Sequence, residues 1–133
     1  MTGRAARLAM LLPSLMLAAC ASGFDQPGTG WSRAPDLSVF ASMEMYGGIA
    51  REQSILCQGF RPEAVRAAWR DDFGARRDAV GAALVARHGA EAVERARLAP
   101  VRRVACREIP DTRWREQYAR MLRLLETRMG LAG

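Results

Sequence analysis

Residues 62–89, PEAVRAAWRDDFGARRDAVGAALVARHG, carry the pattern that decides the fold. Pro62 suits the first turn of a helix, where its missing N–H is not needed, and Gly89 suits the end of one. Between them the large apolar residues recur at intervals of four and seven positions, on one helical face: Val65, Trp69, Phe73, Val80 and Leu84. The stretch therefore predicts a long amphipathic helix, open to a break near Gly74, with Trp69 and Phe73 central to the core.

Three further segments are predicted to be helical from the same periodicity: residues 37–58, 90–98 and 112–129. Asp36 or Ser38 is placed to cap the first of them. Gly59 and Gly130 are placed to end the first and the last. Residues 101–110 show no helical period and are predicted to form an extended connection. Because there is neither a repeat nor a convincing pair of strands, the sequence predicts an all-α bundle of three to four helices.

Gly47 and Gly48 interrupt the first of these helices, at a cost of about 1 kcal/mol each relative to alanine. The pair predicts a kink or the close approach of a second helix, and a backbone that admits a substrate is the alternative. Two of these helices are each predicted to carry an apolar face: Phe40, Met43, Ala50 and Cys57 on the first helix, and Trp114, Tyr118, Met121, Leu122, Leu125 and Met129 on the last. Ion pairs four residues apart support the helices: Asp72–Arg76, Glu91–Arg95 and Glu116–Arg120.

The composition fits one compact domain. The chain has 133 residues, 50% of them apolar and 26% charged, with a net charge of +6. These values exclude a collagen-like chain, a multi-pass membrane protein and a disulfide-dense scaffold. All twenty basic residues are arginine, beside twenty-four alanines, which is typical of a GC-rich genome. The arginines are therefore weak support for nucleic-acid binding, and no nucleic-acid partner is predicted.

An export signal is predicted at the N-terminus. Arg4 and Arg7 precede an uncharged apolar run over residues 8–17, and two alanines lead to Cys20. The ten-residue run would span about 15 Å as a helix, half the hydrocarbon thickness of a bilayer. Residues 17–20, LAAC, resemble the lipobox of bacterial lipoproteins. An ordinary secretory signal and an uncleaved anchor are the alternatives.

The resemblance implies that Cys20 carries a diacylglycerol and becomes the first residue once residues 1–19 are removed. Ala21 follows, where an aspartate commonly marks inner-membrane retention, so the resemblance implies the outer membrane and a domain facing the periplasm. Residues 20–35 are rich in Gly, Pro and Ser and predict a flexible tether, which leaves residues 36–133 as the helical domain. Trp31 either rests among lipid headgroups or packs on the domain.

Two cysteines remain once Cys20 is acylated. Cys57 and Cys106 form an even pair in an oxidising compartment, where a disulfide is the default expectation. Closing a loop of about fifty residues would stabilise the fold by roughly 4 kcal/mol. A reactive thiol is the alternative, although the chain contains no CxxC motif.

One charged segment stands out. Residues 95–115 hold seven arginines and only two acids, Glu108 and Asp111, which gives a net charge of +5. Guanidinium groups bind phosphates and carboxylates with two parallel hydrogen bonds. The segment predicts contact with an anionic lipid, a glycan or an acidic protein surface, and a solvated surface that reflects codon bias is the alternative. The arginines are Arg95, Arg97, Arg102, Arg103, Arg107, Arg113 and Arg115.

Candidates for catalysis are few. His88 is the single histidine, and its place in the last turn before Gly89 favours a contact with free helix carbonyls. The chain lacks the motifs of metal, phosphate and nucleophile sites, so no catalytic residue, metal or cofactor is predicted. The sequence favours a non-enzymatic binding or structural module on the membrane. A small periplasmic hydrolase that uses acidic residues and His88 is the alternative.

Overall fold

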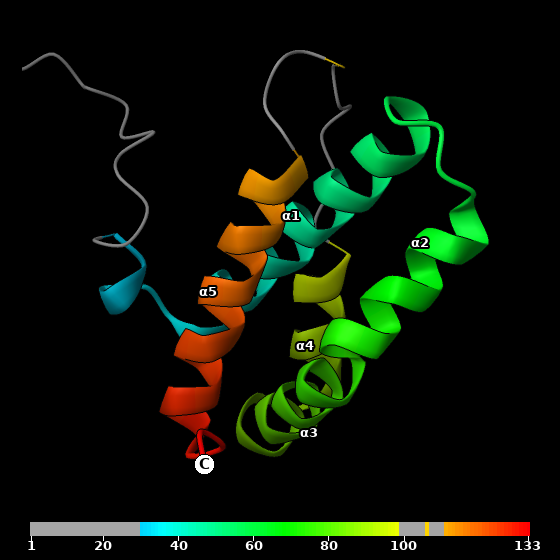
Figure 1. The fold of residues 1–133 in the computed structure, drawn as a ribbon. Helices are drawn as coiled ribbons and strands as arrows, with labels where there is room; N and C mark the ends of the chain where they lie inside the picture. Colours follow the sequence, from blue (N-terminus) through cyan, green and yellow to red (C-terminus); the bar gives the residue numbers. More distant parts are fainter. Residues whose placement is uncertain (1–29, 99–105, 107–110) are drawn as a thin grey trace, which may run out of the picture.

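A computed structural model describes residues 30–98, 106 and 111–133. Within these residues every regular element is helical, and no strand occurs (Figure 1). The predicted all-α bundle with a Cys57–Cys106 disulfide is confirmed. The elements are a 3-10 turn Trp31–Arg33, helices α1 (Asp36–Leu56) and α2 (Pro62–Trp69), a π-helical turn Arg70–Gly74, and helices α3 (Ala75–His88), α4 (Ala90–Arg97) and α5 (Asp111–Met129).

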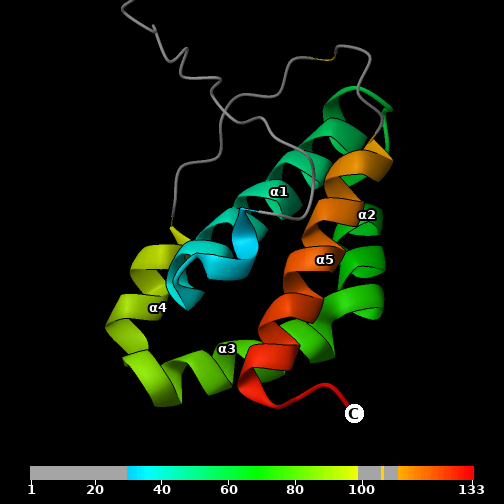
Figure 2. The same ribbon diagram turned by 90° about the vertical axis from the view of Figure 1, so that its left-hand side faces the viewer.

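Helices α1 and α5 pack along each other, and α2, α3 and α4 lie to the right of and below this pair in Figure 1, so that none of these three helices covers the pair from the side seen in Figure 2. Phe40 and Met43 on α1 and Leu122 and Leu125 on α5 are fully buried between the helices. Burial of side chains of this kind is worth about 1.5–3 kcal/mol each, so the α1–α5 contact forms the centre of the core. Leu56, the last residue of α1, is 63% exposed.

The stretch predicted as one long helix is helical throughout residues 62–88, but it is not a single α-helix. All five apolar residues of the predicted stripe are buried. The break that the sequence allows near Gly74 is a π-helical turn over Arg70–Gly74 that joins α2 to α3. Because an α-helix has 3.6 residues per turn, side chains spaced four residues apart shift gradually around the helix axis. A π turn contains more residues per turn and reverses part of this shift. The turn thereby keeps Trp69 and Phe73 on the same side as Val80.

Gly47 on α1 packs against the side chain of Tyr118 on α5. A Cβ atom added there would lie 2.8 Å from Cδ2 and 2.9 Å from Cε2 of Tyr118, and α1 continues as a helix through this position. The predicted close approach of a second helix is confirmed. The Tyr118 ring fills the space above Gly47, so the alternative of a substrate-admitting backbone is wrong.

The start of α1 differs from the prediction. Pro35 is the N-cap residue, and its carbonyl accepts hydrogen bonds from the N–H groups of Ser38 and Val39, both at 3.0 Å. Neither Asp36 nor Ser38 makes a side-chain cap. Asp36 has basic neighbours from α3 and α5 instead, because a carboxylate with several cationic partners gains more than one with a single N–H.

Arg128 fastens the residues before α1 to α5. Its guanidinium donates to the carbonyl oxygens of Trp31 at 2.9 Å, Ser32 at 2.9 Å and Ala34 at 2.7 Å, and to Asp36 Oδ1 at 3.1 Å. The Trp31 side chain packs against the hydrophobic core, which agrees with the second of its two predicted roles. The last residues of the expected tether are therefore part of the folded domain.

Two of the predicted ion pairs have different outcomes. Glu91 pairs with Arg95 at 2.5 Å, as predicted. Asp72 pairs with Arg115 rather than Arg76, and Arg76 makes two hydrogen bonds of 2.7 Å to Glu126 on α5. Bonds between helices replace the bond within one helix because the π turn and the packing of α5 bring other charges closer. The Glu116–Arg120 pair stays a prediction.

Acid should destabilise the domain through two carboxylates. Hydrogen bonds from Arg76 lower the pKa of Glu126. Burial tends to raise the pKa of Asp36, but its hydrogen bonds with Arg128, His88 and Arg87 outweigh this effect, so the pKa of Asp36 is lowered as well. Each group stabilises the fold fully above its unfolded pKa and loses that contribution as the pH falls through its lower folded pKa. The thermal midpoint should therefore fall below about pH 4.5, and Glu126→Gln should flatten this fall.

A thermal melt at each pH between 3 and 6 measures the effect. Glu63→Gln, which removes an exposed acid at the start of α2, is the matched control and should leave the pH dependence unchanged. Equal slopes for Glu126→Gln and the unmodified protein would contradict the assignment.

Candidate functional site

The two cysteines of the domain are joined. The Cys57 and Cys106 sulfur atoms lie 2.09 Å apart and their Cα atoms 5.4 Å apart, so the chain just after α1 is bonded to the segment before α5. The predicted disulfide is confirmed, and the alternative of a reactive thiol is wrong for both residues. Cys20 lies outside the described residues.

The predicted arginine segment is only partly described. Arg102, Arg103 and Arg107 lie outside the described residues. Three of the other four have acidic partners: Arg95 contacts Glu91 at 2.5 Å, Arg97 contacts Glu94 at 3.8 Å, and Arg115 contacts Asp72. Arg113 is exposed and makes no ion pair with a described residue. The four described arginines of the segment therefore do not form a continuous surface of free cations.

Three aromatic rings form a cluster beneath Arg115. The ring centroids of Trp69 and Phe73 are 5.0 Å apart, and each lies 4.9 Å from the centroid of Tyr118. The Arg115 guanidinium carbon lies 5.1 Å from the centroid of Phe73 and 5.6 Å from that of Trp69. Arginine stacks well on such rings because its charge is attracted to the ring face.

A second guanidinium reaches the same indole ring. The guanidinium carbon of Arg51, on α1, lies 5.0 Å from the Trp69 centroid. Its Nη1 atom would lie 3.3 Å from a Cβ added to Gly47, so the missing side chain of Gly47 leaves room for Arg51 as well as Tyr118. Desolvation by burial lowers the pKa of Arg51, although the charge of Glu44 opposes this shift.

The sequence prediction missed Arg51. Arg51 lies far from residues 95–115 in the chain, and one arginine on a predicted helix carries no special signal. Gly47, one turn before it, was the only local sign that a large side chain has room there. The Trp69, Phe73 and Arg115 positions could be predicted individually, but their contact depends on how α5 crosses α2.

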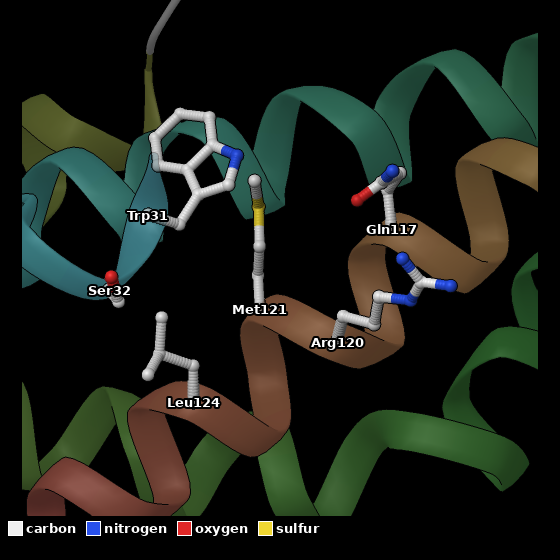
Figure 3. A pocket seen from close by; sticks show the side chains of 6 residues that line it. All are labelled: Trp31, Ser32, Gln117, Arg120, Met121 and Leu124. Atoms are coloured by element: carbon white, nitrogen blue, oxygen red, sulfur yellow. The ribbon is translucent and has the colours of Figure 1, made fainter. Parts of the chain in front are cut away.

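A shallow cavity lies elsewhere, between the 3-10 turn and α5 (Figure 3). The side chains of Trp31, Met121 and Leu124 approach one another across it, and polar groups lie around them (Figure 3). Its volume of about 160 Å³ is below the roughly 300–1,000 Å³ of small-molecule sites. The lining residues are Trp31, Ser32, Gln117, Arg120, Met121 and Leu124.

His88 lies on the surface beside Asp36. Its Nε2 atom is 3.4 Å from Asp36 Oδ2, and Arg87 contacts the same oxygen at 3.3 Å. The cavity between the 3-10 turn and α5 is lined by other residues, so it does not bring His88 and a carboxylate together. Within the part of the chain that the structure describes, no group of three or more His, Cys, Asp or Glu side chains is arranged to hold a metal ion.

Among residues 30–98, 106 and 111–133, no helix combines the length and the apolar character needed to cross a bilayer.

Comparison with known proteins identifies no relative: no family model, curated protein or solved structure matches the chain.

Proposed function

We propose that this protein is a lipid-anchored, non-enzymatic module of the bacterial envelope that binds an anionic partner through surface arginines. The anchor is the diacylglycerol expected on Cys20, and the residues between Cys20 and the 3-10 turn connect it to the helical domain. Two or three acyl chains, at about 0.8 kcal/mol per buried CH₂, hold a protein on a membrane effectively permanently. The presence of Ala21 after the cysteine supports the outer membrane and a domain that faces the periplasm.

The Cys57–Cys106 disulfide is the observation that carries this proposal. Disulfides persist in the periplasm and other oxidising compartments and are rare in the reducing cytosol. Cys20 belongs to the lipobox, and the disulfide joins the other two cysteines of the chain. On this proposal, both the acylation and the disulfide require export of the chain. A hydrolase has less support, because His88 is exposed beside Asp36 and lines no described cavity.

Exposed arginines support the anionic partner. Arg113 lies in the first turn of α5 without an acidic partner among the described residues, and Arg115 and Arg51 stack on the nearby Trp69. Near an anionic membrane surface each such base contributes about 1 kcal/mol to binding. A lipid headgroup, a glycan or an acidic protein surface would each supply the complementary charge.

Loss of the lipidated cysteine should detach the protein from the membrane. In Cys20→Ala no sulfur can receive the diacylglycerol, so we expect the acylated form to vanish from the membrane fraction. Intact-mass spectrometry of that fraction measures both the acyl mass on Cys20 and the loss of two hydrogens in the disulfide. Ser22→Ala, two residues away, is the matched control and should remain acylated. A full-length, unacylated chain with free thiols in the cytoplasm would overturn the proposal.

A further inference from the structure

We propose that Arg51 and Arg115 form an oxyanion site beside Trp69 that takes a phosphate group. The proposal rests on the function proposed above and assigns its anionic contact to particular residues. Arg51, which lies outside the predicted arginine segment, is the principal ligand. Arg115 is the second, and Trp69 is the ring that orients both.

The two guanidiniums are held by the same aromatic cluster. Their central carbons lie 5.0 Å and 5.6 Å from the centroid of the Trp69 ring, and Trp69 is itself 8% exposed and packed on Phe73 and Tyr118. A ring fixed in this way restricts the rotamers of both arginines. Less conformational entropy is then lost when a ligand binds, which is the main advantage of a preorganised site.

Among the described residues near Trp69, the arginines outnumber the carboxylates that pair with them. Arg77 makes two hydrogen bonds to Glu44, at 2.7 Å and 2.6 Å, and Arg115 is paired with Asp72. Arg51 makes neither a hydrogen bond nor an ion pair with any residue that the structure describes, although it is half-buried. A guanidinium that has lost part of its water and has five N–H donors to satisfy favours an added anion.

Phosphate is the anion whose shape fits best. Its tetrahedral oxygens can accept two parallel bonds from the fork of Arg51, and the positive charge of Arg115, stacked near the same ring, adds electrostatic attraction. Asp72 already occupies part of the Arg115 fork, so Arg51 should supply most of the binding. The phosphate could be free in solution or belong to a lipid headgroup, since the chemistry of recognition is the same.

Titration of the isolated protein in a non-ionic detergent tests the site. Inorganic phosphate is one probe, and glycerophosphoglycerol, the headgroup of phosphatidylglycerol without its acyl chains, is the other. Each should raise the thermal midpoint of the unmodified protein in proportion to binding. Tighter binding of glycerophosphoglycerol identifies a lipid headgroup as the natural source, and tighter binding of inorganic phosphate identifies the free ion.

Arg51→Gln should weaken binding of both probes about tenfold or more, because it removes a charge-assisted contact. Arg51→Lys, which keeps the charge but loses the fork, should recover part of the affinity. Arg123→Gln removes one exposed positive charge from the other half of α5 and should leave binding unchanged. The midpoints measured without probe show that each variant is folded.

Two results would overturn the site. The first is no shift of the thermal midpoint with either probe. The second is an equal loss of binding in Arg51→Gln and Arg123→Gln, which would indicate a general charge effect. Neither result affects acylation of Cys20, so the anchor and the oxyanion site are tested separately.

Discussion

Reduction of the Cys57–Cys106 bond should lower the free energy of unfolding by about 4 kcal/mol. The two cysteines are 49 residues apart, and the chain-entropy model assigns about this value to a closed loop of that length. The loss corresponds to about a thousandfold larger unfolded fraction. This loss of stability is a large share of the net stability of a small domain, which is typically about 5–15 kcal/mol. Denaturant unfolding with and without a reductant measures it.

The double variant Cys57→Ser/Cys106→Ser is the control for reduction. It should unfold at the same denaturant concentration as the reduced protein, and reductant should have no effect on it. If the unmodified protein kept its unfolding midpoint under reductant, the disulfide would contribute nothing to stability. Such a result would also remove the structural reason for exporting the chain to an oxidising compartment.

Gly47→Ala should destabilise the domain by about 1–3 kcal/mol, the usual cost of overpacking a core. The new Cβ atom would lie 2.8 Å from the Tyr118 ring, which is 1% exposed and contacts both Trp69 and Phe73. A ring held on several sides cannot move away cheaply, so α1 and α5 must separate. Chemical denaturation gives the change in the free energy of unfolding.

Gly81→Ala provides a matched control of opposite sign. Gly81 is also buried inside a helix, but a Cβ there meets only Nη2 of Arg97, at 3.8 Å. With no clash to offset, the higher helix propensity of alanine should stabilise the protein by about 0.5–1 kcal/mol. Stabilisation by Gly47→Ala would contradict the close approach of the two helices. Tyr118→Ala should abolish the penalty of Gly47→Ala, since the ring is the group that clashes.

Local spacing predicted the helices because it alone determines which side chains share a face. Val65, Trp69, Phe73, Val80 and Leu84 follow such a pattern, and all five are buried. The sequence also predicted the disulfide, since the number of cysteines and the expected compartment left one pairing. The glycine pair predicted that a second helix approaches α1 near Gly47, but only the structure shows that Tyr118 is the residue in contact.

Contacts between helices could not be predicted in the same way. Arg76 was expected to pair with Asp72 on its own helix, yet it binds Glu126, because the path of α5 determines which carboxylate is nearest. Asp36 was expected to cap α1, yet it contacts His88 and Arg128 for the same reason. Arg51 was overlooked because its importance depends on Trp69, which approaches it from another helix.

The bonds of Arg128 determine how the domain withstands mechanical force. A pull on the chain ahead of Trp31 first strains the hydrogen bonds from Arg128 to the carbonyls of Trp31, Ser32 and Ala34. Because Arg128 lies on α5, 97 residues after Trp31, the force is transmitted to this C-terminal helix before it reaches the first turn of α1. Tension on the proposed anchor would thus be shared by both central helices, rather than unfolding the domain from its N-terminal end.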